Sequence, residues 1–252
     1  MNSWQEAVLF NTTEIVARRS GEEWFGTGFF ILANDRLFLV SNRHVLEDDK
    51  EIDYSITVHR RSSVSTGVVL ELGSNRVHID YGNPFNIHFK TTDRYVAPQD
   101  SDVDLALVDL TGIADPPGAV IVPFSPSKIL DWNASLLTPG VEVMFVGYPN
   151  SYSDAMHNLP VVRTGTIASL PMLNFGGTPT FLIDAQVRSG SSGSPVYISA
   201  ESSGGTFSVV GVIQSGVNTF EDSSRHLGLG HAVKSSELFK LVSDALYQLA
   251  NK

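Results

Sequence analysis

The chain has 252 residues, of which 42% are hydrophobic and 17% charged, as in a folded globular protein rather than a disordered one. Its formal charge of −10 and the lack of any run of Lys and Arg argue against nucleic acid as a partner. The absence of cysteine excludes disulfides, thiolate zinc sites and a cysteine nucleophile. The seven histidines are scattered without metal-ligand spacing, so we expect no metal and no cofactor.

The N-terminal segment, residues 1–8, has neither the basic start nor the long apolar run of a signal peptide. No later stretch reaches the length of a membrane span. We therefore expect a cytoplasmic protein without a membrane partner.

The first half of the chain is a succession of short strand patterns separated by turns. A short helical turn is expected at residues 3–9, strands at 14–18, 25–32 and 37–40, and β-hairpins within 52–90. The strand at 25–32 carries Gly26 and Gly28 in its interior. Interior glycines cost stability unless another part of the chain approaches the backbone closely there.

Polar residues flank two of the apolar strands in this half. His44 lies where the chain leaves the strand at 37–40, although a single histidine in such a place is more often structural than catalytic. Asp102 and Asp104 lead into an apolar strand that ends at residue 108. A carboxylate there needs a partner, because an unpaired charge is costly to bury. Asp102 fits a solvated turn better than Asp104 does.

The proline-rich segment 113–139 separates the first half from a second half of similar pattern. We therefore divide the chain into an N-terminal β-barrel at 1–112, a connection at 113–139 and a C-terminal β-barrel at 140–252, together one domain. Many short strands with little helical pattern predict an all-β fold of two antiparallel barrels. The exception is one amphipathic helix at the C-terminus, expected to pack on the second barrel through Leu238, Val242, Ala245, Leu246 and Leu249.

The segment 189–195 holds four serines, two glycines and a proline between two strand patterns, at 180–187 and 196–198. This composition excludes a strand or helix interior and predicts a tight loop held at both ends by a sheet. Such a loop can present backbone N–H groups beside a serine hydroxyl, the geometry that stabilises an oxyanion. Taken alone, however, the loop is better explained as a flexible Gly/Ser turn.

The order of these features along the chain decides between the two interpretations. His44 ends one strand, Asp104 heads a later strand and Ser192 lies in the glycine-bounded loop, which is the order found in chymotrypsin. The chain resembles the chymotrypsin-fold serine proteases, and most closely the bacterial HtrA/Deg protease domain without PDZ domains. The resemblance covers nearly the whole chain and rests on the motifs GTGFFI, SNRHVL, DLALV, DAQVRSGSSGSP, GVIQSG and GLGHAVKSSEL.

The resemblance implies two six-stranded antiparallel β-barrels with a C-terminal α-helix, and a catalytic role for three residues. Ser192, bracketed by Gly190 and Gly193, would be the nucleophile, with His44 as general base and Asp104 orienting it. The N–H groups of Gly190 and Ser192 would form the oxyanion hole. The chain departs from the family pattern at Ser194, where glycine is usual.

The resemblance also implies how a protein or peptide substrate would bind. An extended peptide would lie against Gln214, Ser215 and Gly216 as an added strand. Gln186 and Val187 would line the specificity pocket, with Gly216 at its mouth and Gly230 near its wall. Because no acidic residue occupies the pocket base, cleavage after Arg or Lys is disfavoured and a small or medium apolar residue is expected.

The implied function is therefore a serine endopeptidase that acts through an acyl-enzyme. In HtrA-type proteases the oxyanion loop can be disordered until activated, so a latent state and a separate activator protein belong to this expectation. One alternative is a non-catalytic peptide-binding module on the same fold. Another is an esterase or acyltransferase of different fold, disfavoured because a strand rather than a helix follows Ser192.

Overall fold

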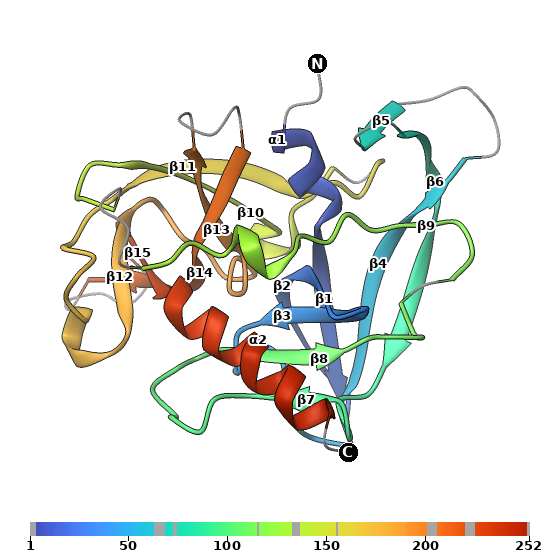
Figure 1. Cartoon of the computed structure of the whole chain (residues 1–252), viewed down its shortest axis with the longest axis horizontal. Helices are drawn as coiled ribbons and strands as arrows, with labels where there is room; N and C mark the ends of the chain where they lie inside the picture. Colours follow the sequence, from blue (N-terminus) through green and yellow to red (C-terminus); the bar gives the residue numbers. More distant parts are fainter. Residues whose placement is uncertain are drawn as a thin grey trace.

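The computed structural model describes residues 4–62, 69–72, 75–114, 116–132, 137–154, 156–200, 206–219 and 225–250. Two β-rich halves lie side by side, and the C-terminal helix crosses in front of them (Figure 1). The chain begins with the short helix α1 (Trp4–Ala7) and a 3-10 turn at Val8–Phe10, which together correspond to the helical turn expected from the sequence.

The first half forms one antiparallel sheet of nine strands. These are β1 (Thr12–Arg19), β2 (Glu22–Ala33), β3 (Arg36–Ser41), β4 (Asp53–Arg61), β5 (Val69–Leu72), β6 (Asn75–Phe89), β7 (Tyr95–Val96), β8 (Ala106–Asp109) and β9 (Ala119–Val120). Their order in the sheet is β5-β6-β4-β1-β2-β3-β8-β7, and β9 pairs with β4. This half therefore has more strands than the six expected, and β9 brings part of the segment expected to be a connection into the sheet.

The second half is a closed barrel of six strands, as expected. It consists of β10 (Glu142–Gly147), β11 (Val161–Ile167), β12 (Thr180–Asp184), β13 (Pro195–Ala200), β14 (Thr206–Asn218) and β15 (His226–Lys234). The strands close in the order β10-β11-β12-β15-β14-β13. β12 ends at Asp184, three residues earlier than the sequence pattern suggested, so the loop that carries Ser192 is longer than expected. The all-β fold with a single long C-terminal helix is confirmed.

The helix α2 (Ser235–Ala250) contacts both halves rather than the second barrel alone. Its buried side chains Leu238, Leu241, Val242 and Ala245 share one core with residues of both halves, among them Phe29, Val40 and Leu107 of the first sheet and Val212 and Val233 of the barrel. The sequence predicted its apolar face but not this second partner. In Figure 1 the helix runs from β14 and β15 towards β7 and β8.

Arg36 of β3 forms an ion pair with Asp109 of β8 and a hydrogen bond with the end of α2. Arg36 Nη1 donates to Asp109 Oδ2 at 2.6 Å, and Nη2 of the same guanidinium donates to the Leu249 carbonyl oxygen at 3.5 Å. The backbone N–H of Thr111 donates to Asp109 Oδ1 at 2.9 Å. Burial raises the pKa of the Asp109 carboxyl, but the hydrogen bonds from Thr111 and Arg36 outweigh it and leave the pKa below its ordinary value.

Replacing Asp109 by asparagine is expected to lower the free energy of unfolding by about 2 kcal/mol at pH 7, because charged hydrogen bonds are lost. Since the folded-state pKa lies below the unfolded value of about 3.9, this contribution is present above that pH and is lost as the pH falls through the folded-state pKa. Urea denaturation of both proteins should show the difference narrowing towards pH 3.

The matched control is Asp53→Asn, which removes an exposed carboxylate that pairs with Lys90 at 2.7 Å. An exposed pair of this kind contributes about 0.5 kcal/mol. Equal losses in the Asp53 and Asp109 variants at pH 7 would contradict the assignment of a stabilising role to Asp109.

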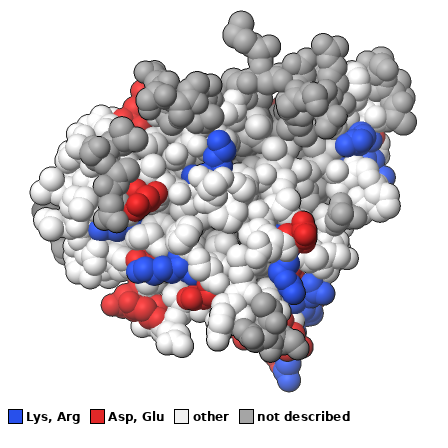
Figure 2. All heavy atoms as spheres, viewed as in Figure 1, with Lys and Arg blue, Asp and Glu red and all other residues white. Residues whose placement is uncertain are grey.

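Charges of both signs are interspersed over the face of the molecule shown in Figure 2, with uncharged surface between them. No broad patch of one sign covers the described part of this face. Because the net charge of the chain is −10, a cluster of positive charges at one site would be a local feature and not a consequence of the overall composition.

Candidate active site

His44 lies in a turn directly after β3, and β2 leaves room for this turn at Gly26. The N–H groups of Val45 and Leu46 both donate to the Asn42 carbonyl oxygen, at 3.1 and 3.0 Å, which folds the segment into a compact turn. A Cβ atom on Gly26 would overlap the Val45 side chain. The close approach predicted from the interior glycines of β2 is thus found, and it supports the histidine turn.

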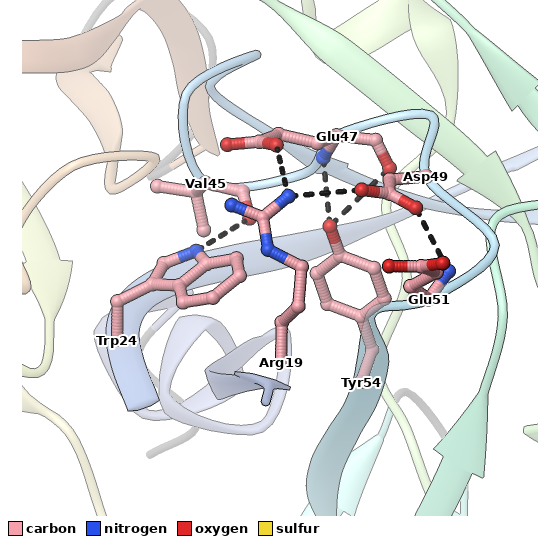
Figure 3. A network of polar contacts seen from close by, with 7 residues as sticks. All are labelled: Arg19, Trp24, Val45, Glu47, Asp49, Glu51 and Tyr54. Carbon is pink, nitrogen blue, oxygen red and sulfur yellow. Dashed lines mark hydrogen bonds and ion pairs between the residues drawn. The ribbon is translucent and has the colours of Figure 1, made fainter. Parts of the chain in front are cut away.

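A polar network holds the segment after His44 against the sheet (Figure 3). Arg19 Nη1 lies 2.9 Å from Asp49 Oδ2 and 3.8 Å from Glu47 Oε2. The Tyr54 hydroxyl accepts a hydrogen bond from the Glu47 N–H at 2.8 Å. Burial raises the pKa of Tyr54 to about 12, so the phenol stays protonated near neutral pH and also donates to the Glu47 carbonyl oxygen at 3.2 Å. The histidine turn is therefore fixed at its C-terminal side.

Asp104 lies two residues before β8 and contacts His44 with both carboxylate oxygens. Oδ2 is 2.7 Å from the ring atom Nδ1, and Oδ1 accepts the His44 backbone N–H at 3.2 Å. Asn42 Nδ2 donates to the Asp104 carbonyl oxygen at 2.7 Å, which ties the two segments together. A carboxylate at Nδ1 favours the proton on that nitrogen and leaves Nε2 as the base. Asp102 is exposed in the preceding turn.

The loop that carries Ser192 has a backbone that only glycine adopts readily at two positions. Gly190 and Gly193 have φ values of +80° and +88°. A Cβ atom would overlap the Tyr148 carbonyl oxygen at Gly190 and the Thr27 carbonyl oxygen at Gly193. The two glycines that bracket the serine in the sequence are therefore required by the packing of the loop.

Three N–H groups of this loop have no hydrogen-bond acceptor among the residues described, namely those of Ser189, Gly190 and Ser192. The neighbouring N–H groups are occupied: Ser191 donates to Arg188, Gly193 to Ile213 and Ser194 to Ser191, at 3.0, 2.9 and 3.0 Å. The Ser189 carbonyl oxygen accepts the Asn150 N–H at 2.6 Å. The Ser189 C=O and the Gly190 N–H belong to one planar trans peptide group and point in opposite directions. The Gly190 N–H therefore points away from Asn150.

The Ser192 hydroxyl donates to the Gln214 carbonyl oxygen at 2.9 Å. No hydrogen bond joins it to His44 within the described part of the chain, although both residues line one cavity of about 360 Å³ with Trp24, Phe25 and Gly190. Contact with His44 requires the hydroxyl to leave Gln214, and catalytic hydrogen bonds are often long or misaligned without substrate.

A second cavity of about 360 Å³ adjoins Ser192 on its other side. Val187, Ser215 and Gly216, three of the residues expected to bind substrate, line it. Gly230 packs against the Val187 side chain, because a Cβ atom on Gly230 would overlap it. Gln186 is exposed and does not line the cavity, and its carbonyl oxygen accepts a hydrogen bond from Arg163 Nη2.

The family is decided by a match to residues 26–211. These residues span the histidine turn, Asp104 and the serine loop, and they match the model of the trypsin-like peptidase domain. The chain belongs to the trypsin-like peptidase family. The class of enzyme expected from the sequence, a trypsin-like serine peptidase, is thereby confirmed. No curated protein matches the chain.

Solved structures of serine proteases share this fold at low sequence identity. The chain is 15% identical to the HtrA-type protease AlgW with tripeptide, with a TM-score of 0.58. The alignment covers 96% of this chain and 62% of that one. The serine endoprotease from Yersinia pestis is 15% identical, with a TM-score of 0.56, and the alignment covers 98% of this chain and 68% of that one. The protease Anisep from Arthrobacter nicotinovorans is 15% identical, with a TM-score of 0.57, and the alignment covers 94% of this chain and 95% of that one.

Thr27 is the residue of this peptidase that the sequence analysis missed. It is fully buried between Gly26 and Gly28 of β2. Its N–H donates to the Ser192 carbonyl oxygen at 2.8 Å, and its hydroxyl donates to the Gly190 carbonyl oxygen at 2.7 Å and accepts the Tyr148 N–H at 3.0 Å. A hydroxyl between two strand glycines was the available signal for a residue that holds the serine loop.

The departure from the family pattern at Ser194 is accommodated by Gly147 at the end of β10. Ser194 is fully buried, and a Cβ atom on Gly147 would overlap its hydroxyl.

Among the described residues no group of His, Asp and Glu side chains could hold a metal ion. No helix in the described part of the chain is long and apolar enough to cross a membrane.

Proposed function

We propose that the chain is a serine endopeptidase that hydrolyses peptide bonds through Ser192, His44 and Asp104. The observation that carries the proposal is the pair of unoccupied N–H groups, on Gly190 and Ser192, next to a hydroxyl that shares a cavity with a carboxylate-bound imidazole. Such N–H groups are the donors that an oxyanion needs.

The reaction would proceed in two steps. In the first, Ser192 Oγ bonds to the peptide carbonyl carbon while His44 Nε2 takes its proton, and the N–H groups of Gly190 and Ser192 stabilise the oxyanion. His44 then protonates the leaving amine, and the C–N bond breaks to give an acyl-enzyme. In the second step water, deprotonated by His44, releases the acid and restores the serine. Asp104 stabilises the imidazolium in both steps.

The edge of β14 at residues 214–216 is the proposed docking line for the substrate backbone. Pairing between β13 and β14 extends only to Val212, and the adjoining loop bonds to Ile213. The backbone of Gln214, Ser215 and Gly216 therefore has one edge unpaired with β13, where an extended peptide can add as a strand. Protein and peptide segments in extended conformation are the substrates that fit this geometry.

Hydrogen bonds hold the serine loop in an arrangement suited to catalysis. Its backbone is held by Thr27, Asn150 and Ile213 in the arrangement that leaves both oxyanion donors free. The Ser192 hydroxyl has to leave the Gln214 carbonyl oxygen to reach His44, with which it shares a cavity. Latency, a separate activator protein and a cytoplasmic location remain predictions from the sequence.

The test is labelling with a fluorophosphonate probe, followed by intact mass. Wild type and Ser194→Ala are expected to gain one probe adduct, whereas Ser192→Ala and His44→Ala gain none. Ser194 is the matched control because it lies in the same loop with its hydroxyl buried. Labelling of the Ser192→Ala protein would refute the assigned nucleophile. Peptide binding without labelling, also after addition of cell extract, would favour the non-catalytic binding module.

A further inference from the structure

The cavity beside Ser192 carries positive charge that no carboxylate among its described lining residues balances. Its lining consists of Asn150, Val187, Arg188, Ser189, Ser192, Ser215, Gly216, Asn218 and His226. None of its described lining residues is Asp or Glu, and among them only Val187 has an aliphatic side chain. The position next to Ser192 makes it the pocket for the residue before the scissile bond, an assignment that rests on the proposed peptidase function.

His226, at the start of β15, lines this cavity. The Gly228 N–H donates to His226 Nδ1 at 2.8 Å, so Nε2 carries the proton of the neutral ring. Nε2 is buried beside the Val187 carbonyl oxygen, and hydrogen bonding to this backbone group raises the pKa of His226. A Cβ atom on Gly216 would overlap Nε2, so glycine at this position gives the imidazole its room.

Two arginines surround this imidazole. Arg188 is exposed in the serine loop and makes no ion pair among the residues described. Arg163 of β11 stacks on Phe145, with 5.0 Å between the guanidinium carbon and the ring centroid, and its buried Nη1 has no described partner. Burial lowers the pKa of His226, and the charges of Arg188 and Arg163 lower it further.

We propose that this pocket binds the side chain of an acidic residue, glutamate or aspartate, with Arg188 and His226 as its specificity-determining residues. A carboxylate can accept charged hydrogen bonds from the Arg188 guanidinium, and it can replace the Val187 carbonyl oxygen as the acceptor for His226 Nε2. Arg163 adds positive charge and holds the pocket wall through its hydrogen bond to the Gln186 carbonyl oxygen.

The lining disfavours the other classes of side chain. A lysine or arginine would meet like charge, with no carboxylate among the described lining residues to pair with. The small or medium apolar residue expected from the sequence would contact Val187 but would bury the polar groups of Asn150, Ser189 and Asn218 without satisfying them. The positive pocket is a local feature, because the chain as a whole has a net charge of −10.

The test uses two peptides that differ only in Glu or Gln before the cleavage position, since this exchange removes the charge and keeps the shape. Calorimetric titration of the Ser192→Ala protein separates binding from catalysis. The glutamate peptide is expected to bind about tenfold to a hundredfold more tightly. Arg188→Gln and His226→Gln should each reduce this preference severalfold, whereas Arg61→Gln on β4, an exposed arginine of the first sheet, should preserve it.

Turnover of fluorogenic peptides by the wild type, with Glu, Gln, Leu, Ala or Lys before the reporter group, gives the second measurement. Equal binding of the Glu and Gln peptides, or a higher kcat/KM for Leu, Ala or Lys, would overturn the acidic assignment. Fluorophosphonate labelling at Ser192 would in that case leave the peptidase function intact. Absence of labelling together with a retained preference for the glutamate peptide would overturn the function and support the pocket.

Discussion

The Asp104→Asn protein is expected to cleave peptides with a kcat about 10⁴-fold below that of the wild type while keeping its fold. The carboxylate accepts hydrogen bonds from both the ring Nδ1–H and the backbone N–H of His44. An amide in its place presents a donor to Nδ1 and favours the tautomer that protonates Nε2. The base needed to take the Ser192 proton would then be blocked.

The matched control is Asp102→Asn, the same chemical change two residues earlier. Asp102 is exposed in the turn before β8 and has no contact with His44 among the hydrogen bonds of the described residues. Peptide turnover and the fluorophosphonate labelling rate should fall only in the Asp104 variant, and thermal denaturation should be close to wild type in both. Comparable rate losses in the two variants would show that general perturbation of this turn, rather than loss of the tautomer, slows the reaction.

The choice between these two aspartates shows what the sequence could predict. The apolar run after residue 104 implied that the adjoining carboxylate would lie at the end of a buried strand, and the structure brings it to His44. The amphipathic face of α2 was predicted equally well from the spacing of Leu238, Val242 and Ala245. Periodicity identifies which side of an element is buried, but it does not identify the element that covers it. For this reason the contact of α2 with β8 was missed.

The charged pocket could not be predicted from the sequence, for a related reason. Arg188 and His226 belong to segments 38 positions apart, and each alone fits an exposed loop residue or a strand end. Their meeting depends on the irregular pairing of β14 with β15, where register shifts follow Ile213 and Gly216. The two-residue strand β9 was missed because so short a segment carries no alternating pattern.

Replacing Thr27 by valine is expected to lower the rate of Ser192 labelling about 10²-fold, the effect of disturbing one oxyanion donor. Valine keeps the shape of the side chain but cannot donate to the Gly190 carbonyl oxygen or accept the Tyr148 N–H. The first contact holds the carbonyl of the Gly190–Ser191 peptide, which adjoins the Ser189–Gly190 peptide whose N–H must face the reacting carbonyl, and the second holds the Thr27 hydroxyl in place. Thr27 is thus a positioning residue, and Thr27→Ser should restore most of the rate.

Thr13→Val separates this role from a general loss of stability. Thr13 is a buried threonine of β1, its partner in the sheet is Gly28, and its hydroxyl donates to the Thr57 carbonyl oxygen at 2.9 Å. Both valine variants lose buried hydrogen bonds and should be destabilised by about 1–3 kcal/mol in urea. Only Thr27→Val should also be labelled slowly, because only Thr27 contacts the serine loop. Equal labelling rates in the two variants would mean that the loop holds its oxyanion donors without Thr27, and would leave Asn150 as the residue that orients the Gly190 peptide.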